Sequence, residues 1–436
     1  MLKTSDNNNG NLIVDSKIDL QNLGDISNRS IEELIQKNHD LLVFPQNLKK
    51  YGDAIDRQFI FSLSGNKLTT HNIMGYIGIN KTETQLRIAS RFDNGRNDYF
   101  LHYMLQKVFS INIFDLKFGT DEDTIWNFLL YLFPYFLNKA IRQGLFKTYV
   151  RNYYNSVNLK GSVEIERHLR INNPFNGKIA YKIREFSFDN AITQLIRHTI
   201  EYIKSSPLGI GVLSSCNETI ENVKIIIENT PRFNKNNKDK IISMNIKLLN
   251  HPFFMYYSLL QKICLHILRN KKITFGDNKD KIYGLLFDGA WLWEEYLNKV
   301  FIDNGLELEH PRNKEKKGGD NLFIGGPRIY PDFIKREKKS NTARYIGDAK
   351  YKHKMTREDY YQLTTYMYRY ECNKGYLLFP CSENDSLFQY VRVFDGNKRD
   401  RKCIELGIKI DQSETMFKEF KENMKKAERK MCECLK

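Results

Sequence analysis

Residues 328–366 read RIYPDFIKREKKSNTARYIGDAKYKHKMTREDYYQLTTY, and this stretch decides the predicted fold of the C-terminal part of the chain. Residues 329–334 and 343–351 are rich in strand-forming side chains. The polar residues 338–342 between them are typical of a turn. Two such runs with a short break predict a β-hairpin.

Two acidic residues, Asp332 and Asp348, face each other in this hairpin if it is symmetric about Ser340. Directly opposed side chains in an antiparallel pair have Cβ atoms about 4.5–5.5 Å apart. Carboxylates that close repel each other unless one is protonated or a cation lies between them. Mg²⁺ binds one or two carboxylates and keeps positions open for phosphate and water. Lys350 shares a face with Asp348 because side chains alternate along a strand, so the three residues predict a metal-dependent phosphodiesterase site.

The Asp-x-Lys spacing is weak evidence by itself, because it also begins at Asp15, Asp115 and Asp277. The alternative to a catalytic role is a structural one. Structural ion pairs are common, and Lys350 would then be an ordinary strand lysine paired with an acid on a solvated face. The spacing at Asp348 is accompanied by a facing acid and by a following polar helix. That combination favours the catalytic interpretation.

Three motifs together resemble the PD-(D/E)xK nuclease superfamily: Pro331-Asp332, Asp348-Ala349-Lys350 and Gln362-x-x-x-Tyr366. The last of these resembles the branch of the superfamily that carries a Gln-x-x-x-Tyr signature. Upstream, residues 292–297 (LWEEYL) resemble the helix that supplies a further acidic side chain, and Glu294 matches that position best.

Within this superfamily the sequence is similar to McrC, the nuclease subunit of McrBC-type restriction systems, and to its LlaJI-like relatives. Further segments carry the same resemblance: residues 75–88 to the N-terminal part of that family, 159–165 and 188–191 to its middle region, and 376–380 to the strand after the nuclease motifs. The resemblance spans about residues 70–395.

The resemblance implies a nuclease subunit of a McrBC-like restriction system for phage defence, which associates with a separate McrB-like AAA+ GTPase or ATPase in a hetero-oligomer. The motor would translocate DNA, and this chain would cut it with Mg²⁺, for which Mn²⁺ could substitute. The sequence contains no Gly-x-x-x-x-Gly-Lys-Ser/Thr loop, so we expect no nucleotide to bind to this chain itself.

Individual roles follow for five residues. Asp332, Asp348 and Glu294 would hold the metal ion, although Glu294 has the alternative of being a solvated helix acid. Lys350 would orient the attacking water or help to deprotonate it, and would offset developing charge. Gln362 would fix a phosphate or the water.

Further residues are expected to contact DNA. Tyr366 lies one helical turn after Gln362 and shares its face, so it could contact the backbone of DNA or pack in the core. The basic candidates are Lys335, Arg336 and Lys352, and the histidines His310 and His353 are expected at the surface or beside phosphate.

Composition agrees with a folded, nucleic-acid-binding protein. The chain has 436 residues, a hydrophobic fraction of 41% and a net charge of +16, which predicts two or three domains and a polyanionic partner. The alternative explanation for part of this charge is a coding bias, since the chain is rich in Asn, Lys and Ile. Seven scattered cysteines argue against a disulfide framework and for a reducing cytoplasm. Their spacing matches neither a zinc site nor the iron–sulfur pattern of some superfamily relatives.

No targeting segment is evident at the polar start of the chain, and the predicted location is cytoplasmic. The most apolar run, residues 125–141, is short for a membrane span and contains Asn127, Pro134 and Asn138. It is better explained as a buried helix, so no membrane association is expected.

The predicted fold class is a multidomain α+β or α/β protein with three consecutive regions. Residues 1–95 are expected to form a strand-rich N-terminal domain for partner or DNA contact, 96–275 a mainly helical middle region, and 280–436 a PD-(D/E)xK-type mixed-sheet nuclease core with a C-terminal helix. That last helix is expected to begin at Asp411, with Glu414 closing a capping box. Its apolar stripe is Phe417, Phe420, Met424, Ala427 and Met431.

Two other functions remain open from the sequence. The chain could be a non-catalytic DNA-binding adaptor with a decayed nuclease fold, although the complete set of Asp332, Asp348 and Lys350 argues against decay. It could also be chiefly a regulator that stimulates a partner NTPase.

Overall fold

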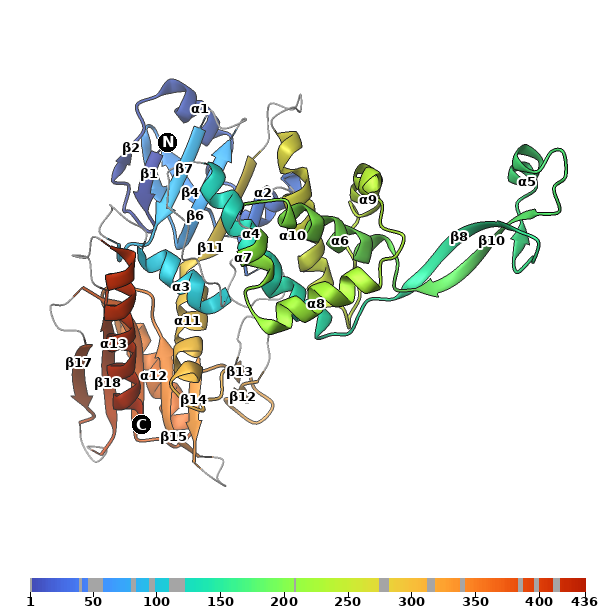
Figure 1. Ribbon diagram of the computed structural model, residues 1–436. Helices are drawn as coiled ribbons and strands as arrows, with labels where there is room; N and C mark the ends of the chain where they lie inside the picture. Colours follow the sequence, from blue (N-terminus) through green and yellow to red (C-terminus); the bar gives the residue numbers. More distant parts are fainter. Residues whose placement is uncertain are drawn as a thin grey trace. The chain divides into compact units, whose positions relative to one another are not determined.

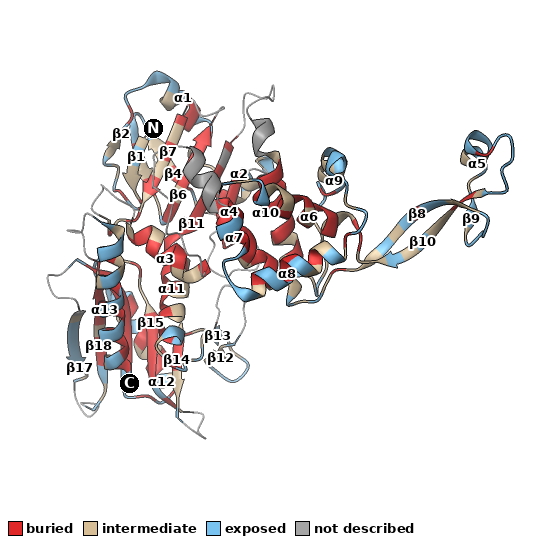
Figure 2. Ribbon diagram, in the orientation of Figure 1, coloured by how far each residue is buried: buried red, intermediate tan, exposed pale blue. Residues whose placement is uncertain are grey.

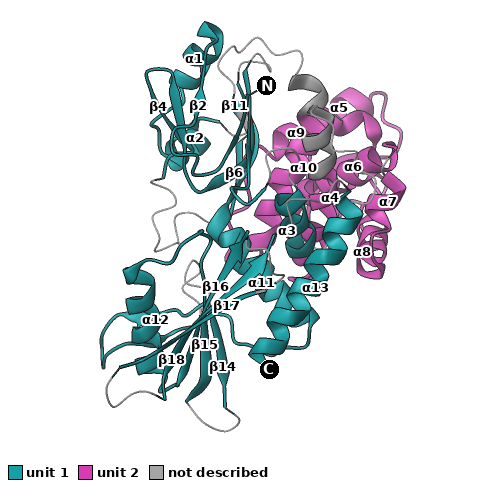
Figure 3. Ribbon diagram, turned by 90° about the vertical axis from the view of Figure 1, so that its left-hand side faces the viewer, with its two compact units in different colours: residues 1–110, 277–436 teal, residues 111–276 magenta. Residues whose placement is uncertain are grey.

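The computed structural model describes residues 2–38, 41–45, 58–79, 84–93, 99–109, 122–207, 209–273, 282–311, 318–337, 342–382, 387–395, 400–410 and 416–436. The chain divides into two compact units (Figure 3). One unit comprises residues 1–110 and 277–436, and the other comprises residues 111–276. The first unit is therefore assembled from the two ends of the chain, which differs from the three consecutive regions expected from the sequence.

A five-stranded sheet with the order β1-β7-β6-β11-β3 explains this difference (Figure 1). The sequence-based boundaries assigned residues 282–288 to the C-terminal region, but β11 pairs antiparallel with β6 and parallel with β3. An apolar run does not specify which sheet it joins, because its partners are distant in sequence. The strands are β1 Leu2–Ser5, β3 Leu41–Phe44, β6 Ile73–Ile79, β7 Thr84–Ala89 and β11 Ile282–Asp288.

A second, smaller sheet lies in the same N-terminal part, with the order β2-β5-β4. Its strands are β2 Leu12–Ile13, β4 Phe61–Ser64 and β5 Lys67–Thr70, and the helices beside them are α1 Lys17–Gly24 and α2 Ile31–Lys37. Each helix begins after a serine, Ser16 or Ser30, whose side chain accepts a hydrogen bond from the first turn. Leu23 and Leu34 from the two helices join one apolar cluster with strand residues.

The C-terminal half of the first unit is built on a mixed sheet with the order β14-β15-β16-β18-β17. Its three central strands are parallel, and the two edge strands run antiparallel to their neighbours. The strands are β14 Phe333–Arg336, β15 Ala343–Ala349, β16 Lys374–Cys381, β17 Leu387–Val393 and β18 Lys402–Lys409. The predicted order of helix, strand, strand, helix and strand is present as α11 Gly289–Asp303, β14, β15, α12 Arg357–Arg369 and β16.

Helices cover this mixed sheet. Leu363 and Met367 of α12 pack in one buried cluster with Leu377 of β16. The C-terminal helix α13, Phe417–Leu435, buries four of the five residues of its predicted stripe: Phe420, Met424, Ala427 and Met431. The predicted start of this helix, Asp411 with Glu414, lies outside the described residues. A further helix, α3 Tyr99–Phe109, buries one face in the first unit.

The second unit is dominated by helices. The longest are α4 Glu122–Ile141, α6 Ala191–Lys204, α8 Asn217–Glu228 and α10 Met255–Ile273, and the shorter ones are α7 Gly209–Leu213, the 3₁₀ turn η3 Lys235–Asn237 and α9 Lys238–Met244. Leu132 and Phe133 of α4 are fully buried, as expected of a core helix. Among the described residues, no helix is long and apolar enough to cross a membrane.

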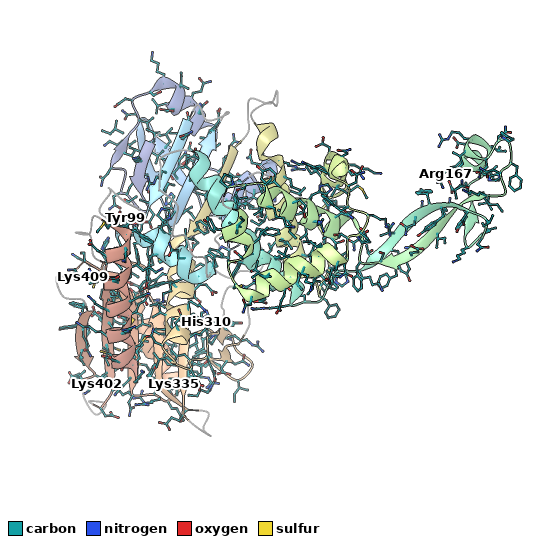
Figure 4. The ribbon with its side chains drawn as sticks, viewed as in Figure 1. Tyr99, Arg167, His310, Lys335, Lys402 and Lys409 are labelled. Atoms are coloured by element: carbon teal, nitrogen blue, oxygen red, sulfur yellow. The ribbon has the colours of Figure 1, made fainter. Side chains whose placement is uncertain are left out.

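A long antiparallel hairpin is also part of the second unit and was not expected in a mainly helical region. β8 Thr148–Ser156 pairs with β10 Ile179–Ser187 along its full length, and β9 Ser162–Val163 and α5 Ile165–Ile171 lie between them in sequence. Most of this hairpin is exposed or half-buried (Figure 2). Arg184 lies over the ring of Tyr149, and Arg167, labelled in Figure 4, lies over that of Tyr153.

Candidate active site

The hairpin between β14 and β15 has the predicted register at its open end. Phe333 lies opposite Gly347, and Ile334 lies opposite Ile346, so the pairing is symmetric about residue 340. This symmetry ends between Lys335 and Arg336, where the register of the strand pairing shifts. The turn itself, residues 338–341, lies outside the described part of the chain.

The first strand of this hairpin is shorter than predicted. Residues 329–334 do not form one strand, because β13 Arg328–Ile329 pairs with β12 Asp320–Asn321, and β14 begins only at Phe333. Pro331 separates the two strands, since proline has no N–H to donate to a sheet ladder. Asp332 therefore precedes β14 directly.

Asp332 is held against the end of the neighbouring strand. Its Oδ2 atom accepts a hydrogen bond of 2.7 Å from the backbone N–H of Ala349. Burial raises the pKa of Asp332 well above its usual range, and the charges of Glu294 and Asp348 raise it further. The three predicted metal ligands thus lie within electrostatic reach of one another.

Lys350 occupies the centre of the site. Its Nζ atom lies 2.7 Å from Oδ2 of the buried Asp348 and donates a hydrogen bond of 2.8 Å to Oε1 of Gln362. Burial lowers the pKa of Lys350, but the charges of Asp348 and Asp332 outweigh burial, and the net pKa is above its ordinary value. The neighbouring carboxylates therefore favour the ammonium form of Lys350.

Gln362 and Tyr366 lie one turn apart on α12, as predicted. The side-chain amide of Gln362 donates a hydrogen bond of 2.9 Å to the hydroxyl of Tyr366. Gln362 is exposed, whereas Tyr366 is buried and belongs to the apolar cluster beneath α12. This placement favours core packing over DNA contact for the ring of Tyr366.

Glu294 lies on α11, next to His310. His310, labelled in Figure 4, was expected at the surface or beside phosphate; the surface position is wrong, because its side chain is only 8% exposed. Its Nδ1–H donates a hydrogen bond of 2.8 Å to the carbonyl oxygen of Asp332, and its ring stacks on Phe333. Its Nε2 atom lies 3.7 Å from Oε1 of Glu294 and 3.9 Å from Oε1 of Glu295. His310 therefore lies between the backbone of Asp332 and the acids of α11.

The carboxylates of the site have the chemistry of a metal-binding set, but their side chains are not gathered around one point. Among the described residues, no three His, Cys, Asp or Glu side chains are gathered closely enough to hold a metal as they stand. The chemistry nevertheless suits a hard divalent cation, which prefers carboxylate oxygens. The repulsion that raises the pKa of Asp332 comes from Glu294 and Asp348, and a cation among these acids would relieve it.

The three basic residues predicted to contact DNA already have protein partners. The Nζ atom of Lys352 contacts both oxygens of Asp359 at 2.7 and 2.6 Å. Arg336 pairs with Glu309 and Asp320. Lys335, labelled in Figure 4, donates to a backbone carbonyl, that of Glu307, and its side chain is half-buried.

Sequence reasoning missed Asp359, the buried acid at the start of α12. Its carboxylate also accepts a hydrogen bond from the backbone N–H of Thr356 at 2.7 Å, which completes a capping box. The Thr-x-x-Asp spacing before a helix is the signal that could have identified it. The second flanking histidine, His353, is exposed, as expected, with its ring against that of Phe92.

The fold and the site together define a class: a multidomain protein of mixed helices and sheets in which the C-terminal sheet and its helices bring acids, a lysine and an amide into one cluster. The family model described as "McrBC 5-methylcytosine restriction system component" matches residues 68–380. Since this is more than half of the 436 residues, the chain belongs to that family. The similarity to the McrBC family predicted from the sequence is thereby confirmed. No curated protein matches the sequence.

Among the solved structures similar to this chain are two complexes from Thermococcus gammatolerans. A half-complex of Thermococcus gammatolerans McrB AAA+ hexamers with bound McrC contains a chain that is 15% identical, with a TM-score of 0.48 and coverage of 93% of this chain and 94% of that chain. A structure of the Thermococcus gammatolerans McrBC complex gives 12% identity and a TM-score of 0.33, with coverage of 71% and 89%. These values are low, and the family assignment rests on the family model.

Proposed function

We propose that this protein is the nuclease subunit of a McrBC-like restriction system, and that it hydrolyses phosphodiester bonds of DNA through a PD-(D/E)xK-type site. The observation that supports this most strongly is the position of Lys350. Its ammonium contacts both Asp348 and Gln362, while Asp332 is tied to the adjacent residue, Ala349. Motifs that are separate in the sequence thus meet in one cluster.

In this proposal, Asp332, Asp348 and Glu294 hold Mg²⁺, or Mn²⁺ in its place. A bound divalent ion supplies positive charge that polarises the phosphodiester and makes water a better nucleophile. The protein itself contributes by holding the acids in position before the metal ion binds. The N–H of Ala349 orients the carboxylate of Asp332, and His310 holds the backbone of the same residue.

Lys350 acts as a cation in this proposal. The contacts of its Nζ atom with Asp348 and Gln362 favour a role in orienting the water and offsetting charge on the phosphate. Deprotonation of the water stays the second predicted role. The exposed amide of Gln362, which accepts a hydrogen bond from Lys350, is placed to fix the phosphate or the water.

A separate AAA+ NTPase is the proposed partner. The family is that of a restriction system component, and the similar Thermococcus chain was solved with McrB AAA+ hexamers. The net charge of +16 supports DNA as the substrate, since basic surfaces favour polyanions. Lys352 and Arg336 contribute less to that surface than expected, because both are paired within the protein.

The proposal is tested by plasmid cleavage with the assembled complex, in Mg²⁺ and after chelation of the metal. Nicking or linearisation that chelation abolishes and Mn²⁺ restores is expected. The regulator alternative is separated by nucleotide turnover of the AAA+ partner with and without the Asp348→Ala variant. A nuclease subunit loses cutting in this variant, and a chain that is only a regulator shows stimulated turnover and no Mg²⁺-dependent cutting even as the wild type.

A further inference from the structure

Four charged side chains of alternating sign run from the centre of the site to the start of α12. Oδ2 of Asp348 lies 2.7 Å from Nζ of Lys350, which lies 3.8 Å from Oδ1 of Asp359. Oδ2 of Asp359 lies 2.6 Å from Nζ of Lys352. Lys350 thus has one carboxylate in contact and a second one just beyond hydrogen-bond distance.

These charged side chains interact strongly because they are buried or half-buried. The side chains of Asp348, Lys350 and Asp359 are 3%, 14% and 8% exposed, and that of Lys352 is 33% exposed. Charges in such an environment are screened less than those in water, and a buried carboxylate without a cation is costly. Asp359 therefore requires a positive partner.

Lys352 fills that requirement. It contacts both oxygens of Asp359, and the backbone N–H of Thr356 contacts one of them. Burial alone would raise the pKa of Asp359, but the hydrogen bonds from Lys352 and Thr356 outweigh burial and lower it. With Lys352 in place, the charge of Asp359 is neutralised by Lys352. Lys350 then remains in contact with Asp348 and Gln362.

We propose that Lys352 is a positioning residue: by pairing with Asp359, it prevents that acid from drawing Lys350 away from Asp348 and Gln362. Without the charge of Lys352, Asp359 becomes a buried carboxylate, and among the described residues the cation left within 4.0 Å of it is Lys350, at 3.8 Å. A shift of about 1 Å would bring Nζ of Lys350 from 3.8 Å to hydrogen-bond distance of Asp359. Directed away from Asp348, the same shift would lengthen the 2.7 Å contact to about 3.7 Å, beyond hydrogen-bond distance. This inference deepens the proposed nuclease function and rests on it for its effect on rate.

The competing explanation is that Lys352 binds a phosphate of DNA, as the sequence alone suggests. The two explanations differ in what they change. Loss of a phosphate contact weakens DNA binding. It also reduces the slope of log affinity against log salt concentration by about 1. Loss of a positioning residue slows the chemical step and leaves DNA affinity unchanged.

The test uses the full chain with its AAA+ partner and Mg²⁺, in four forms: wild type, Lys352→Gln, the double variant Lys352→Gln/Asp359→Asn, and Lys354→Gln. Lys354 is exposed and two residues further along, so its variant is the matched control for loss of one lysine. Single-turnover cleavage at saturating DNA and equilibrium DNA binding at several salt concentrations are measured for each form. Asparagine keeps an oxygen for the N–H of Thr356, so the cap on α12 survives.

We expect Lys352→Gln to slow cleavage on the order of 100-fold, since a misplacement of about 1 Å in an active site can cost that much. Its DNA affinity and salt dependence should match those of Lys354→Gln. The double variant should recover most of the lost rate, because the acid that attracts Lys350 is then neutral. A double variant as slow as Lys352→Gln, or a loss confined to DNA binding, would overturn the inference.

A crystal structure of Lys352→Gln tests the same inference without activity. The expected result is Nζ of Lys350 in hydrogen-bond contact with Asp359 and separated from Asp348. An unmoved Lys350 would refute the positioning role even if the wild type cut DNA normally. A wild type that cuts no DNA, together with a moved Lys350, would instead refute the proposed function alone.

Discussion

The backbone N–H of Ala349 and the side chain of Asp332 are joined by a hydrogen bond of 2.7 Å. This bond places an acid that lies just outside β14 at the end of β15, beside Asp348. It also leaves the second oxygen of the Asp332 carboxylate for another ligand. The site therefore lies at the open end of a hairpin. Backbone pairing ends there at Phe333 and Gly347, and the next hydrogen bond across the hairpin is made by the side chain of Asp332.

Removal of the central acid should abolish cutting. Asp348→Ala takes away a proposed metal ligand and the partner of Lys350, so cleavage should fall at least about 100-fold, with partner binding nearly intact. Plasmid cleavage and co-purification with the AAA+ protein measure the two effects. Asp400→Ala, which removes an exposed acid, is the control and should cut normally. Wild-type cutting by Asp348→Ala would refute the site assignment.

Lys350→Ala should have a similar effect on rate for a different reason. It removes the ammonium that contacts Asp348 and Gln362 and leaves a buried carboxylate without its cation. We expect cleavage to be lost while DNA affinity is retained, as measured by filter binding. A Lys350→Ala protein that cuts normally but binds DNA weakly would show that this lysine contacts DNA and takes no part in the chemistry.

A buried acid on α13 should be important for stability. Glu428 is 2% exposed, and its Oε1 atom accepts hydrogen bonds from the hydroxyls of Tyr103 and Tyr296 at 2.7 and 2.8 Å. Its other oxygen pairs with Lys107 at 3.1 Å. Glu428→Ala leaves these donors buried without their acceptor, which should lower the free energy of unfolding by about 3 kcal/mol. Urea denaturation measures it.

The matched control for this change is Glu422→Ala, on the same helix and exposed. It should alter stability by less than about 0.5 kcal/mol. Equal losses in the two variants would mean that the buried network does not stabilise the first unit.

The acid side of the stability profile should depend on Asp359. Its pKa is lowered in the folded protein because Lys352 and Thr356 outweigh the effect of burial. A lowered pKa stabilises the fold above the ordinary value of 3.8, and this contribution is lost as pH falls through the folded pKa. Asp359→Asn should therefore lose less stability than the wild type on acidification, as followed by urea midpoints.

Asp400→Asn is the control for that experiment, since it removes the same charge from an exposed position. Its urea midpoint should fall with pH in parallel with that of the wild type. An Asp359→Asn curve parallel to both would show that this acid is not linked to folding.

The ring of Tyr366 should matter more than its hydroxyl. The residue is buried in the cluster beneath α12, and its hydroxyl accepts a hydrogen bond from Gln362. Tyr366→Phe should lower the free energy of unfolding by about 1 kcal/mol and leave DNA affinity unchanged. Tyr366→Ala should cost about 3–5 kcal/mol. A marked loss of DNA affinity in Tyr366→Phe would instead support the DNA contact.

Patterns of residues close together in the sequence predicted much of the candidate site. Alternating strand formers around a polar break predicted the pairing of Phe333 with Gly347, and helical spacing put Gln362 next to Tyr366. These relationships depend on residues that are close in sequence, where the periods of strand and helix fix which side chains share a face.

Relationships between distant segments were not predictable in the same way. The placement of β11 between β6 and β3 depends on which edge its apolar run meets. Arg336 was expected to face DNA because neither Glu309 nor Asp320, its partners, is identifiable from spacing. His310 was expected at the surface because its contacts with Asp332 and Phe333 exist only once the hairpin has packed on α11.

The most direct test of the central claim is cleavage of plasmid DNA in Mg²⁺ by the wild type and by Asp348→Ala, each with and without the AAA+ partner and its nucleotide. We predict cutting only by the wild type with partner, nucleotide and metal together. Cutting that persists in Asp348→Ala would contradict the assigned site. No cutting of unmodified or 5-methylcytosine-containing plasmid under any of these conditions, with DNA binding intact, would contradict the nuclease function and favour a DNA-binding adaptor.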